Sequence, residues 1–301
     1  MHPSVPDPRP RRLYVIYNPA AGWRRRWRYR KVLAHLARLG CALTLCETAA
    51  RGDAEALARA ADPAAVDLVV AAGGDGTINE VINGLAASPI PLAILPLGTA
   101  NVLAAEIGLA GSARAIAETI ATQAPRPVFL GSANGRRFAL MVGVGFDARV
   151  VADLDLGLKR AFGKLAYVLA ALRQLLAYRA RRYLVEIDGR PFTAAALVIA
   201  KGHYYGGRFT IAPAARLEEP RLYVALFECP GRWNLLRYGW GLLSGRIGRL
   251  SDVRVVPARS VSVRAESAEP GEAVQADGDL AATLPLAVTV TDATLALVTA
   301  A

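Results

Sequence analysis

The sequence AAGGDGTINEVINGL occupies residues 71–85, directly after the apolar run DLVV and directly before an amphipathic helical pattern. Adjacent glycines allow a backbone to approach a polyphosphate closely. A helix that begins near Thr77 would present its first N–H groups and the positive end of its dipole to the same anion. The stretch therefore predicts a buried strand, a phosphate-binding glycine loop and a helix.

Asp75 lies inside this glycine loop. A carboxylate so close to bound phosphate would be repelled unless Mg²⁺ or a substrate proton stood between them. We therefore interpret Asp75 as a residue that organises a metal–phosphate complex, or as a base. The structural alternative is a plain strand-to-helix turn in which Asp75 is the N-cap of the helix.

Outward from this stretch, the first 125 residues alternate short apolar runs with helical patterns. The apolar runs are LYVIY (13–17), ALTLC (42–46), DLVVAA (67–72) and PLAIL (91–95). They show little internal alternation, which is typical of parallel strands covered on both faces. We predict a doubly wound α/β sheet, whose ligands bind at the carboxyl ends of the strands.

Two more polar turns follow strands of this predicted sheet. YNPAAG (17–22) ends the first strand and contains Asn18, and PLGTANVLA (96–104) follows the fourth and contains Thr99 and Asn101. Each turn alone is a weak signal. Together with the glycine loop they predict one crevice for a phosphate ligand, because the carboxyl ends of parallel strands meet at one edge.

After residue 125 the pattern changes to strand-like pieces separated by turn signals. The turns NGRR (134–137) and DGRP (188–191) favour hairpins, and we expect an antiparallel β-sandwich or barrel. A helical insertion over 154–182 and a basic, aromatic stretch over 232–249 interrupt it. The apolar faces of both fit either the core or a membrane surface.

The formal net charge is +11, and residues 1–31 hold nine basic side chains against Asp7 alone. Within them, WRRRWRYRK (23–31) interleaves aromatic and basic groups, which suits nucleic-acid phosphates, anionic lipid headgroups or a solvated face. Tryptophan with arginine favours a membrane interface. No nucleic-acid recognition module accompanies the arginines, so we do not expect nucleic-acid binding.

Several classes of protein are disfavoured by composition. The apolar stretch 163–178 is interrupted by Lys164 and Arg173, so we expect no membrane-spanning helix. The N-terminus carries proline and charge where a signal peptide is apolar, which predicts a cytoplasmic protein. Three cysteines without CxxC spacing favour neither a disulfide framework nor a zinc site.

Other catalytic motifs do not occur in the sequence: it has no GxxxxGK[ST], GxGxxG, HExxH or GxSxG pattern, and three histidines. Phosphoryl transfer needs little more than positioned phosphates, Mg²⁺ and one base. Asp75 and Asp279 offer two carboxylates for those tasks. Because they are far apart in sequence, we expect a cleft between two domains to bring them together.

The motifs NPxxG, GGDGTINEVINGL and PLGTANxLA together resemble the bacterial diacylglycerol kinase catalytic-domain family, which includes sphingosine and ceramide kinases. GVGFDARVV (143–151), YYGGRFTIAPAARL (204–217) and DGD (277–279) fit the same pattern. The GGDG motif alone is shared with NAD kinases and phosphofructokinases. The resemblance implies an α/β nucleotide-binding domain over 1–125, to which 288–301 returns, and a β-sandwich lipid-substrate domain over 126–287.

The resemblance also implies a set of residues at an ATP site in the first domain. Carried over position by position, these residues are Asn18, Thr48, Gly73, Gly74, Asp75, Gly76, Thr77, Ile78, Asn79, Gly98, Thr99 and Asn101.

For catalysis, the resemblance assigns the role of general base on the lipid hydroxyl to Asp279, where the family usually has the glutamate of DGE. It also implies a structural Mg²⁺ near a turn that usually reads Asp-Gly and here reads Glu219-Pro220. We expect Glu219 to bind this ion with the backbone oxygens of Arg216 and Arg221. Proline at 220 removes the freedom of the glycine and puts this site in question.

The sequence thus predicts an ATP-dependent, Mg²⁺-requiring lipid kinase acting on a diacylglycerol-like or sphingoid lipid. We expect it to bind the anionic inner face of the membrane peripherally through its basic, aromatic stretches. A homodimer is left open. Two alternatives stand: a kinase of a soluble substrate such as NAD, and a regulator that binds nucleotide or lipid without catalysis.

Overall fold

The computed structural model describes residues 11–20, 25–109, 111–154, 164–267 and 271–300. The chain forms two compact units. The first contains residues 1–128 and 294–301, and the second contains residues 129–293. The chain crosses between the units within strand β5 (Pro125–Ala133) and within strand β18 (Leu286–Val298).

The first unit contains a parallel sheet in the order β2-β1-β3-β4, and the end of β18 joins β4 in parallel. Its strands are β1 (Arg12–Tyr17), β2 (Ala42–Glu47), β3 (Leu68–Gly73) and β4 (Leu92–Pro96). Its helices are α1 (Arg26–Arg38), α2 (Asp53–Arg59), α3 (Asp75–Gly84), α4 (Val102–Glu106) and α5 (Ala113–Thr122).

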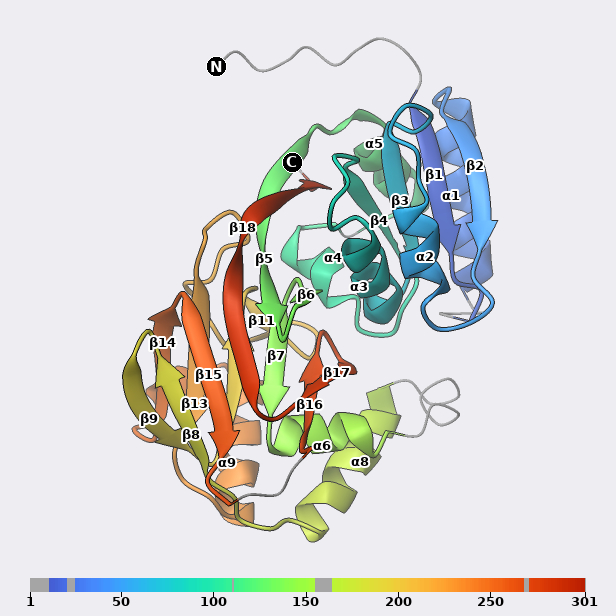
Figure 1. Cartoon of the computed structure of the whole chain (residues 1–301). Coiled ribbons are helices and arrows are strands. Elements are labelled where there is room, and N and C mark those ends of the chain that lie inside the picture. The colour runs from blue at the N-terminus through green and yellow to red at the C-terminus, as the bar shows by residue number, and fades with distance from the viewer. Residues whose placement is uncertain (1–10, 21–24, 110, 155–163, 268–270, 301) are drawn as a thin grey trace. The chain divides into compact units, whose positions relative to one another are not determined.

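Helices flank this sheet in two pairs, α1 with α5 and α2 with α3 (Figure 1). Every residue of β3 and of β4 is buried. This explains the unbroken apolar runs, because a strand covered on both faces has no side that needs polar residues. The predicted doubly wound α/β fold is confirmed.

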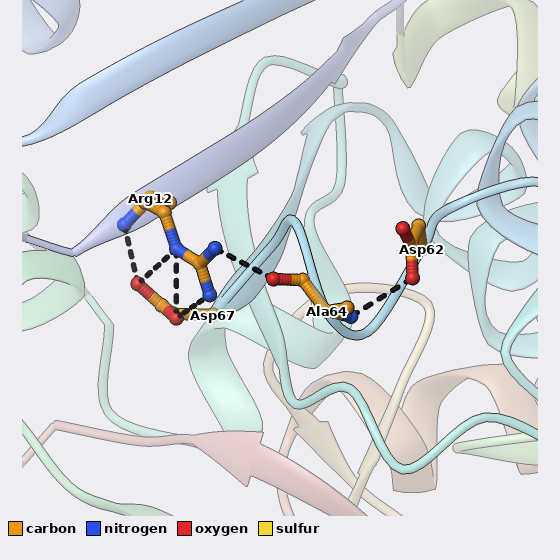
Figure 2. Close-up of polar contacts among 4 residues, drawn as sticks. All are labelled: Arg12, Asp62, Ala64 and Asp67. Carbon is orange, nitrogen blue, oxygen red and sulfur yellow. Dashed lines mark hydrogen bonds and ion pairs between the residues drawn. The ribbon is translucent and has the colours of Figure 1, made fainter.

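The amino ends of β1 and β3 are joined by polar contacts (Figure 2). The backbone N–H and the guanidinium of Arg12 both donate to the Asp67 carboxylate, at 2.7 Å to Oδ2 and 2.6 Å to Oδ1. The same guanidinium donates to the carbonyl of Ala64, 2.7 Å away. These contacts lie at the opposite ends of the strands from the glycine loop and serve the fold.

The second unit is an antiparallel β-sandwich with a core of buried aliphatic and aromatic side chains. One sheet has the order β18-β15-β8-β9, with β5 and β6 attached, and the other β14-β13-β10-β7-β16-β17. The strands are β6 (Arg136–Phe138), β7 (Met141–Val144), β8 (Tyr183–Ile187), β9 (Arg190–Ala194), β10 (Ala196–Ala200), β13 (Leu222–Phe227), β14 (Val253–Ala258), β15 (Ser260–Ala265), β16 (Ala273–Ala276) and β17 (Asp279–Thr283). A small hairpin joins β11 (Tyr204–Tyr205) and β12 (Phe209–Thr210). The predicted sandwich is confirmed.

Three hairpins of this unit use a two-residue turn with positive φ at both positions, as a type I′ turn requires. The turns are Asn134-Gly135, Asp188-Gly189 and Asp277-Gly278. The first two confirm the hairpins predicted from NGRR and DGRP. The third sets the position of Asp279, which begins β17 immediately after the turn.

The helices of the second unit are α6 (Phe146–Ala152), α8 (Lys164–Leu176) and α9 (Arg232–Leu243), followed by the 3₁₀ turn η2 (Ile247–Arg249). The insertion predicted over 154–182 thus contains a helix, and its residues 155–163 lie outside the described part of the chain. Within the described residues, no helix has the length and apolarity needed to cross a bilayer.

Candidate nucleotide and substrate sites

The glycine loop and the loop after β4 are in direct backbone contact. The Leu97 N–H donates to the Gly73 carbonyl, at 2.8 Å. A Cβ on Gly98 would lie 2.6 Å from the Gly74 Cα, closer than any side chain tolerates. Position 98 therefore requires glycine, whereas a Cβ on Gly74 would make a tight contact of 3.2 Å with the Gly98 Cα, and the two loops pack directly against each other.

Asn18 connects these loops to the end of β1. Its backbone N–H donates to the Ala72 carbonyl at 3.0 Å, and its side-chain Nδ2 donates to the Thr77 hydroxyl at 3.0 Å. The hydrogen-bond ladder of α3 starts with the Ile78 N–H, which donates to the Gly74 carbonyl. The N–H groups of Gly76 and Thr77 come before that ladder, at the positive end of the helix dipole, where anions bind.

Asp75 is not the N-cap of its own helix, so this detail of the structural alternative is wrong. The N-cap of α3 is Gly74, with no side-chain capping bond. Instead, Oδ1 of Asp75 accepts from the Val102 N–H, 2.8 Å away, at the start of α4. Asn101 turns the chain there with φ of 49° and closes its loop through the Gly98 N–H and carbonyl, at 2.7 and 2.8 Å. The Asp75 carboxylate thus lies between the glycine loop and the PLGTAN loop.

The other predicted nucleotide-site residues differ in exposure. Thr99 is exposed, whereas Thr48 is buried with its N–H on the Tyr17 carbonyl at 2.9 Å. Ile78 and Asn79 are buried in α3. The structure therefore places the side chain of Ile78 in the core, so that only its backbone is available to a ligand.

Two residues that contact the predicted nucleotide-site loops were missed by sequence reasoning. The Arg25 guanidinium donates to the Gly98 carbonyl and so places a cation beside the PLGTAN loop. Asp53 accepts from the backbone N–H groups of Ala49 and Ala50, both at 2.8 Å, which lowers the pKa of its carboxyl and orders the loop after Thr48. The proximity of Arg25 in sequence to the NPAAG turn is the signal that could have identified it.

In the second unit, the two aspartates of DGD have different environments. The buried Asp277 carboxylate accepts from the N–H groups of Ala139, Leu140 and Met141, at 2.8 to 3.0 Å. Asp279 is half-buried at the start of β17. Asp277 therefore fixes the β16–β17 turn to the start of β7, and Asp279 is the more exposed of the two aspartates.

The second unit contains an apolar cavity of about 150 Å³, lined by residues of β7, α6, β10, β13 and α9 among others. Asp147 and Tyr205 line it, and the Tyr205 hydroxyl donates to the Asp147 carboxylate. Gln275 donates to Asp147 Oδ2 at 2.6 Å and accepts from the Gly278 N–H at 2.9 Å. Burial raises the pKa of Asp147, and burial followed by the neighbouring carboxylate raises that of Tyr205.

The motif GVGFDARVV fits the family pattern, but the sequence predicted no role for its Asp147. The signal was present, because a lone carboxylate in an apolar segment after a strand needs partners wherever it is buried. The sequence alone does not show that Gln275, on another strand, is one of these hydrogen-bond partners.

The three residues predicted to hold a structural Mg²⁺ lie in the segment between β12 and β13. Glu219 is exposed. The Arg216 carbonyl already accepts from the Lys201 ammonium, at 2.6 Å, and from the Glu219 N–H, at 3.4 Å. Across the described residues, no three His, Cys, Asp or Glu side chains gather in a way that could hold a metal ion.

Comparisons with known proteins cover both units. Residues 12–133 match the diacylglycerol kinase catalytic domain, and residues 140–299 match the YegS C-terminal NAD kinase beta sandwich-like domain. The chain is 28% identical over 286 residues to a diacylglycerol kinase of Bacillus subtilis (strain 168), covering 91% of this chain and 92% of that protein. It is 31% identical over 252 residues to a diacylglycerol kinase of Mycobacterium tuberculosis (strain ATCC 25618 / H37Rv), covering 81% and 80%.

Among solved structures, a diacylglycerol kinase from Bacillus anthracis str. Sterne superposes with a TM-score of 0.78 at 25% identity, over 96% of this chain and 97% of that one. The family expected from the motifs is confirmed. The chain belongs to the diacylglycerol kinase and YegS family of lipid kinases, which phosphorylate an alcohol group of a lipid with ATP as co-substrate.

Proposed function

We propose that the chain transfers the γ-phosphate of ATP to a hydroxyl of a diacylglycerol-like or sphingoid lipid at a membrane surface. The observation that carries this proposal is the hydrogen-bonded connection, inside the second unit, between an apolar cavity and the turn that precedes Asp279. A lipid substrate needs an apolar pocket next to a group that activates its hydroxyl. The second unit contains an apolar cavity, and Asp147 and Gln275 connect it to the turn before Asp279.

The size of the cavity limits how much of the lipid it takes. An apolar cavity of ~150 Å³ is filled by a group the size of benzene. This cavity, at about 150 Å³, therefore suits the part of an acyl or sphingoid chain nearest the headgroup. The remainder of the chain would stay in the bilayer.

We assign Asp279 as the general base. It takes the proton of the lipid hydroxyl while that oxygen attacks the γ-phosphorus, the bond to the β-phosphate oxygen breaks and ADP leaves. Gln275 supports this role indirectly. It connects Asp147 to the Gly278 N–H and so fixes the turn before Asp279.

The nucleotide is assigned to the crevice of the first unit. The support is the close packing of Gly74 against Gly98, where a Cβ on Gly98 would collide, together with the helix N-terminus at Thr77. Arg25 would contact a phosphate, and Asn18 and Thr99 would border the nucleotide. When bound, Mg²⁺ neutralises charge on the transferred phosphate, and Asp75 is the carboxylate that would hold it.

A membrane-facing surface is proposed on α8 and α9, the amphipathic surface helices. Their exposed apolar side chains recur at helical spacing: Leu165, Val168, Leu169, Leu172 and Leu176 on α8, and Trp233, Leu236, Trp240 and Leu243 on α9. Trp233 is 83% exposed and Trp240 71%. Because Leu235, Tyr238, Gly239 and Leu242 of α9 line the cavity, one helix separates the cavity from this surface.

Charge supports a membrane as the partner of that surface. The Arg232 guanidinium donates to the Leu176 carbonyl at 2.6 Å, which fixes the start of α9 against the end of α8. Arg173, Arg179 and Arg246 are exposed on or beside the two helices. Apolar side chains among basic ones match the acyl and headgroup layers of an anionic bilayer.

Transfer of labelled γ-phosphate from ATP to mixed micelles of diacylglycerol, sphingoid base or ceramide tests the proposal. We expect label in one lipid, with a loss of ~10²-fold or more in kcat for Asp279→Asn, the range typical of general base removal. Asp292→Asn removes an exposed carboxylate from the same unit and serves as the control. Label in NAD, or ATP binding without label in any lipid, would refute the proposal.

Vesicle sedimentation tests the membrane surface. We expect the wild-type chain to bind anionic vesicles more tightly than neutral ones, and the Trp233→Ser/Trp240→Ser double variant to bind at least ~10-fold more weakly. Trp27→Ser, on α1, probes the first basic stretch and should change less. Equal binding by both variants and the wild type would contradict the assignment.

The homodimer stays a prediction, which light scattering tests. The location at the inner face of the membrane also stays a prediction, which cell fractionation tests.

A further inference from the structure

A lysine is completely buried in the second unit. Lys201 follows β10 and has no exposed surface. Its Nζ donates to the carbonyl oxygens of Arg216, at 2.6 Å, and Leu217, at 3.1 Å. Its backbone N–H donates to the Leu140 carbonyl at 2.7 Å. A buried ammonium is unfavourable unless such groups surround it, so its position is specified by the fold.

A second cationic side chain donates hydrogen bonds to carbonyl groups of the same loop. The Arg216 guanidinium donates to the carbonyls of Pro213, at 3.0 Å, and Ala215, at 2.7 Å. Lys201 and Arg216 together therefore satisfy four carbonyl oxygens of the segment 213–217. Backbone carbonyl oxygens of a loop are also groups that bind a divalent cation.

A divalent ion cannot share these oxygens with Lys201. Mg²⁺ requires close to six oxygen ligands at 2.0–2.1 Å in octahedral geometry. The Arg216 oxygen is already bonded to an ammonium and an N–H, and an ion on the same oxygen would face the ammonium at short range, where like charges repel. Glu219, the one carboxylate assigned to the site, is exposed in a turn followed by Pro220.

We infer that Lys201 replaces a structural divalent cation in this chain, so that the fold of the second unit needs no metal. The magnesium requirement is then restricted to the nucleotide. The inference concerns the second unit alone and holds whichever lipid is phosphorylated.

The position of Lys201 gives this replacement a role in the substrate pocket. Lys201 precedes the β11–β12 hairpin and its partners Arg216 and Leu217 follow it. The ammonium thus closes the base of the segment that carries Tyr205 and Ile211, both of which line the apolar cavity. Closing the segment restricts its conformations and holds the Tyr205 hydroxyl on Asp147.

Thermal unfolding of the nucleotide-free chain tests the inference. We expect the same midpoint in excess EDTA and in millimolar Mg²⁺. Lys201→Met removes the ammonium that binds the Arg216 and Leu217 carbonyls, so its midpoint should fall by ~5 °C or more, and Mg²⁺ should not restore it. Lys31→Met removes an exposed lysine of α1 and should behave as the wild type.

A wild-type midpoint that falls in EDTA and recovers with Mg²⁺ would overturn the inference, and this measurement does not depend on any variant folding. A Lys201→Met chain as stable as the wild type would also overturn it. Because neither readout involves phosphoryl transfer, these outcomes are separate from a failure of the proposed function.

Discussion

The Asp75→Asn substitution separates the structural role of this side chain from its chemical one. Oδ1 of Asp75 accepts from the Val102 N–H at 2.8 Å, and an asparagine amide oxygen can accept the same bond. A hydrogen bond to a charged group contributes about 1.5–3 kcal/mol and a neutral one about 0.5–1.5 kcal/mol. We therefore expect Asp75→Asn to lower the free energy of unfolding by about 1 kcal/mol.

The effect on the reaction should be larger. If the carboxylate holds the metal–phosphate complex, removing its charge should lower kcat/KM by ~10²–10³, or about 2.7–4 kcal/mol of transition-state stabilisation. Asp75→Ala loses both functions: it leaves the Val102 N–H unpaired, at a cost of about 1–3 kcal/mol in stability, and should be at least as inactive.

Urea unfolding and the labelled-phosphate assay measure the two effects on the same preparations. Asp62→Asn is the matched control, because Asp62 accepts one backbone N–H, that of Ala64 at 2.9 Å, on an exposed loop. If Asp75→Asn kept near wild-type kcat/KM, the carboxylate would be a structural acceptor and the reasoning would be refuted. A stability loss equal to that of Asp75→Ala would refute the first part of it.

Three other substitutions test the loops of the predicted nucleotide site. Gly98→Ala puts a Cβ 2.6 Å from a backbone atom, so it should cost about 1–3 kcal/mol in urea unfolding and raise the KM for ATP, whereas Gly248→Ala, in open space, should do neither. Arg25→Ala should raise the KM for ATP by ~10-fold with little change in kcat, and an unchanged KM would exclude a phosphate contact. Because the folded-state pKa of Asp53 lies below its ordinary value, its stabilising contribution is present at neutral pH and disappears as acid titrates the carboxyl. Asp53→Asn should therefore differ from the wild type in urea unfolding near neutrality and converge with it in acid.

The sheet of the first unit could be predicted because its strands are buried on both faces. Each apolar run from LYVIY to PLAIL became a strand of the parallel sheet within one or two residues of its expected ends. The hairpins were predictable for a different reason, since Asn-Gly and Asp-Gly adopt positive φ at both turn positions. In both cases the information is local in the sequence.

Contacts between distant segments could not be predicted in this way. Whether Asp75 caps its own helix or contacts Val102 depends on where the PLGTAN loop lies, and the local pattern is the same in both cases. The two aspartates of DGD are equally indistinguishable in sequence. Only the register of β7 against β16 shows that Asp277 meets three backbone N–H groups while Asp279 does not.

The positive charge of the chain divides into two populations. Several cations satisfy carbonyls of the fold: the guanidinium groups of Arg11 on Ile120 and Gln123, and of Arg28 on Gly111, act in the first unit. Such side chains donate hydrogen bonds to carbonyl oxygens that loops or helix ends leave without backbone N–H partners. They contribute to the net charge of +11, although part of each guanidinium already binds carbonyl oxygens of the fold.

The affinity for an anionic membrane should therefore follow the exposed arginines beside α8 and α9 rather than the net charge. Arg173 and Arg246 belong to this population, whereas Arg232 is exposed and yet bonded to the Leu176 carbonyl. Lys201 is the extreme example of a cation that binds carbonyls. Its fully buried ammonium counts in the formal net charge but exposes no positive charge at the protein surface. The net charge of an arginine-rich chain thus counts side chains that bind carbonyl groups together with side chains that face solvent, and the structure is needed to distinguish them.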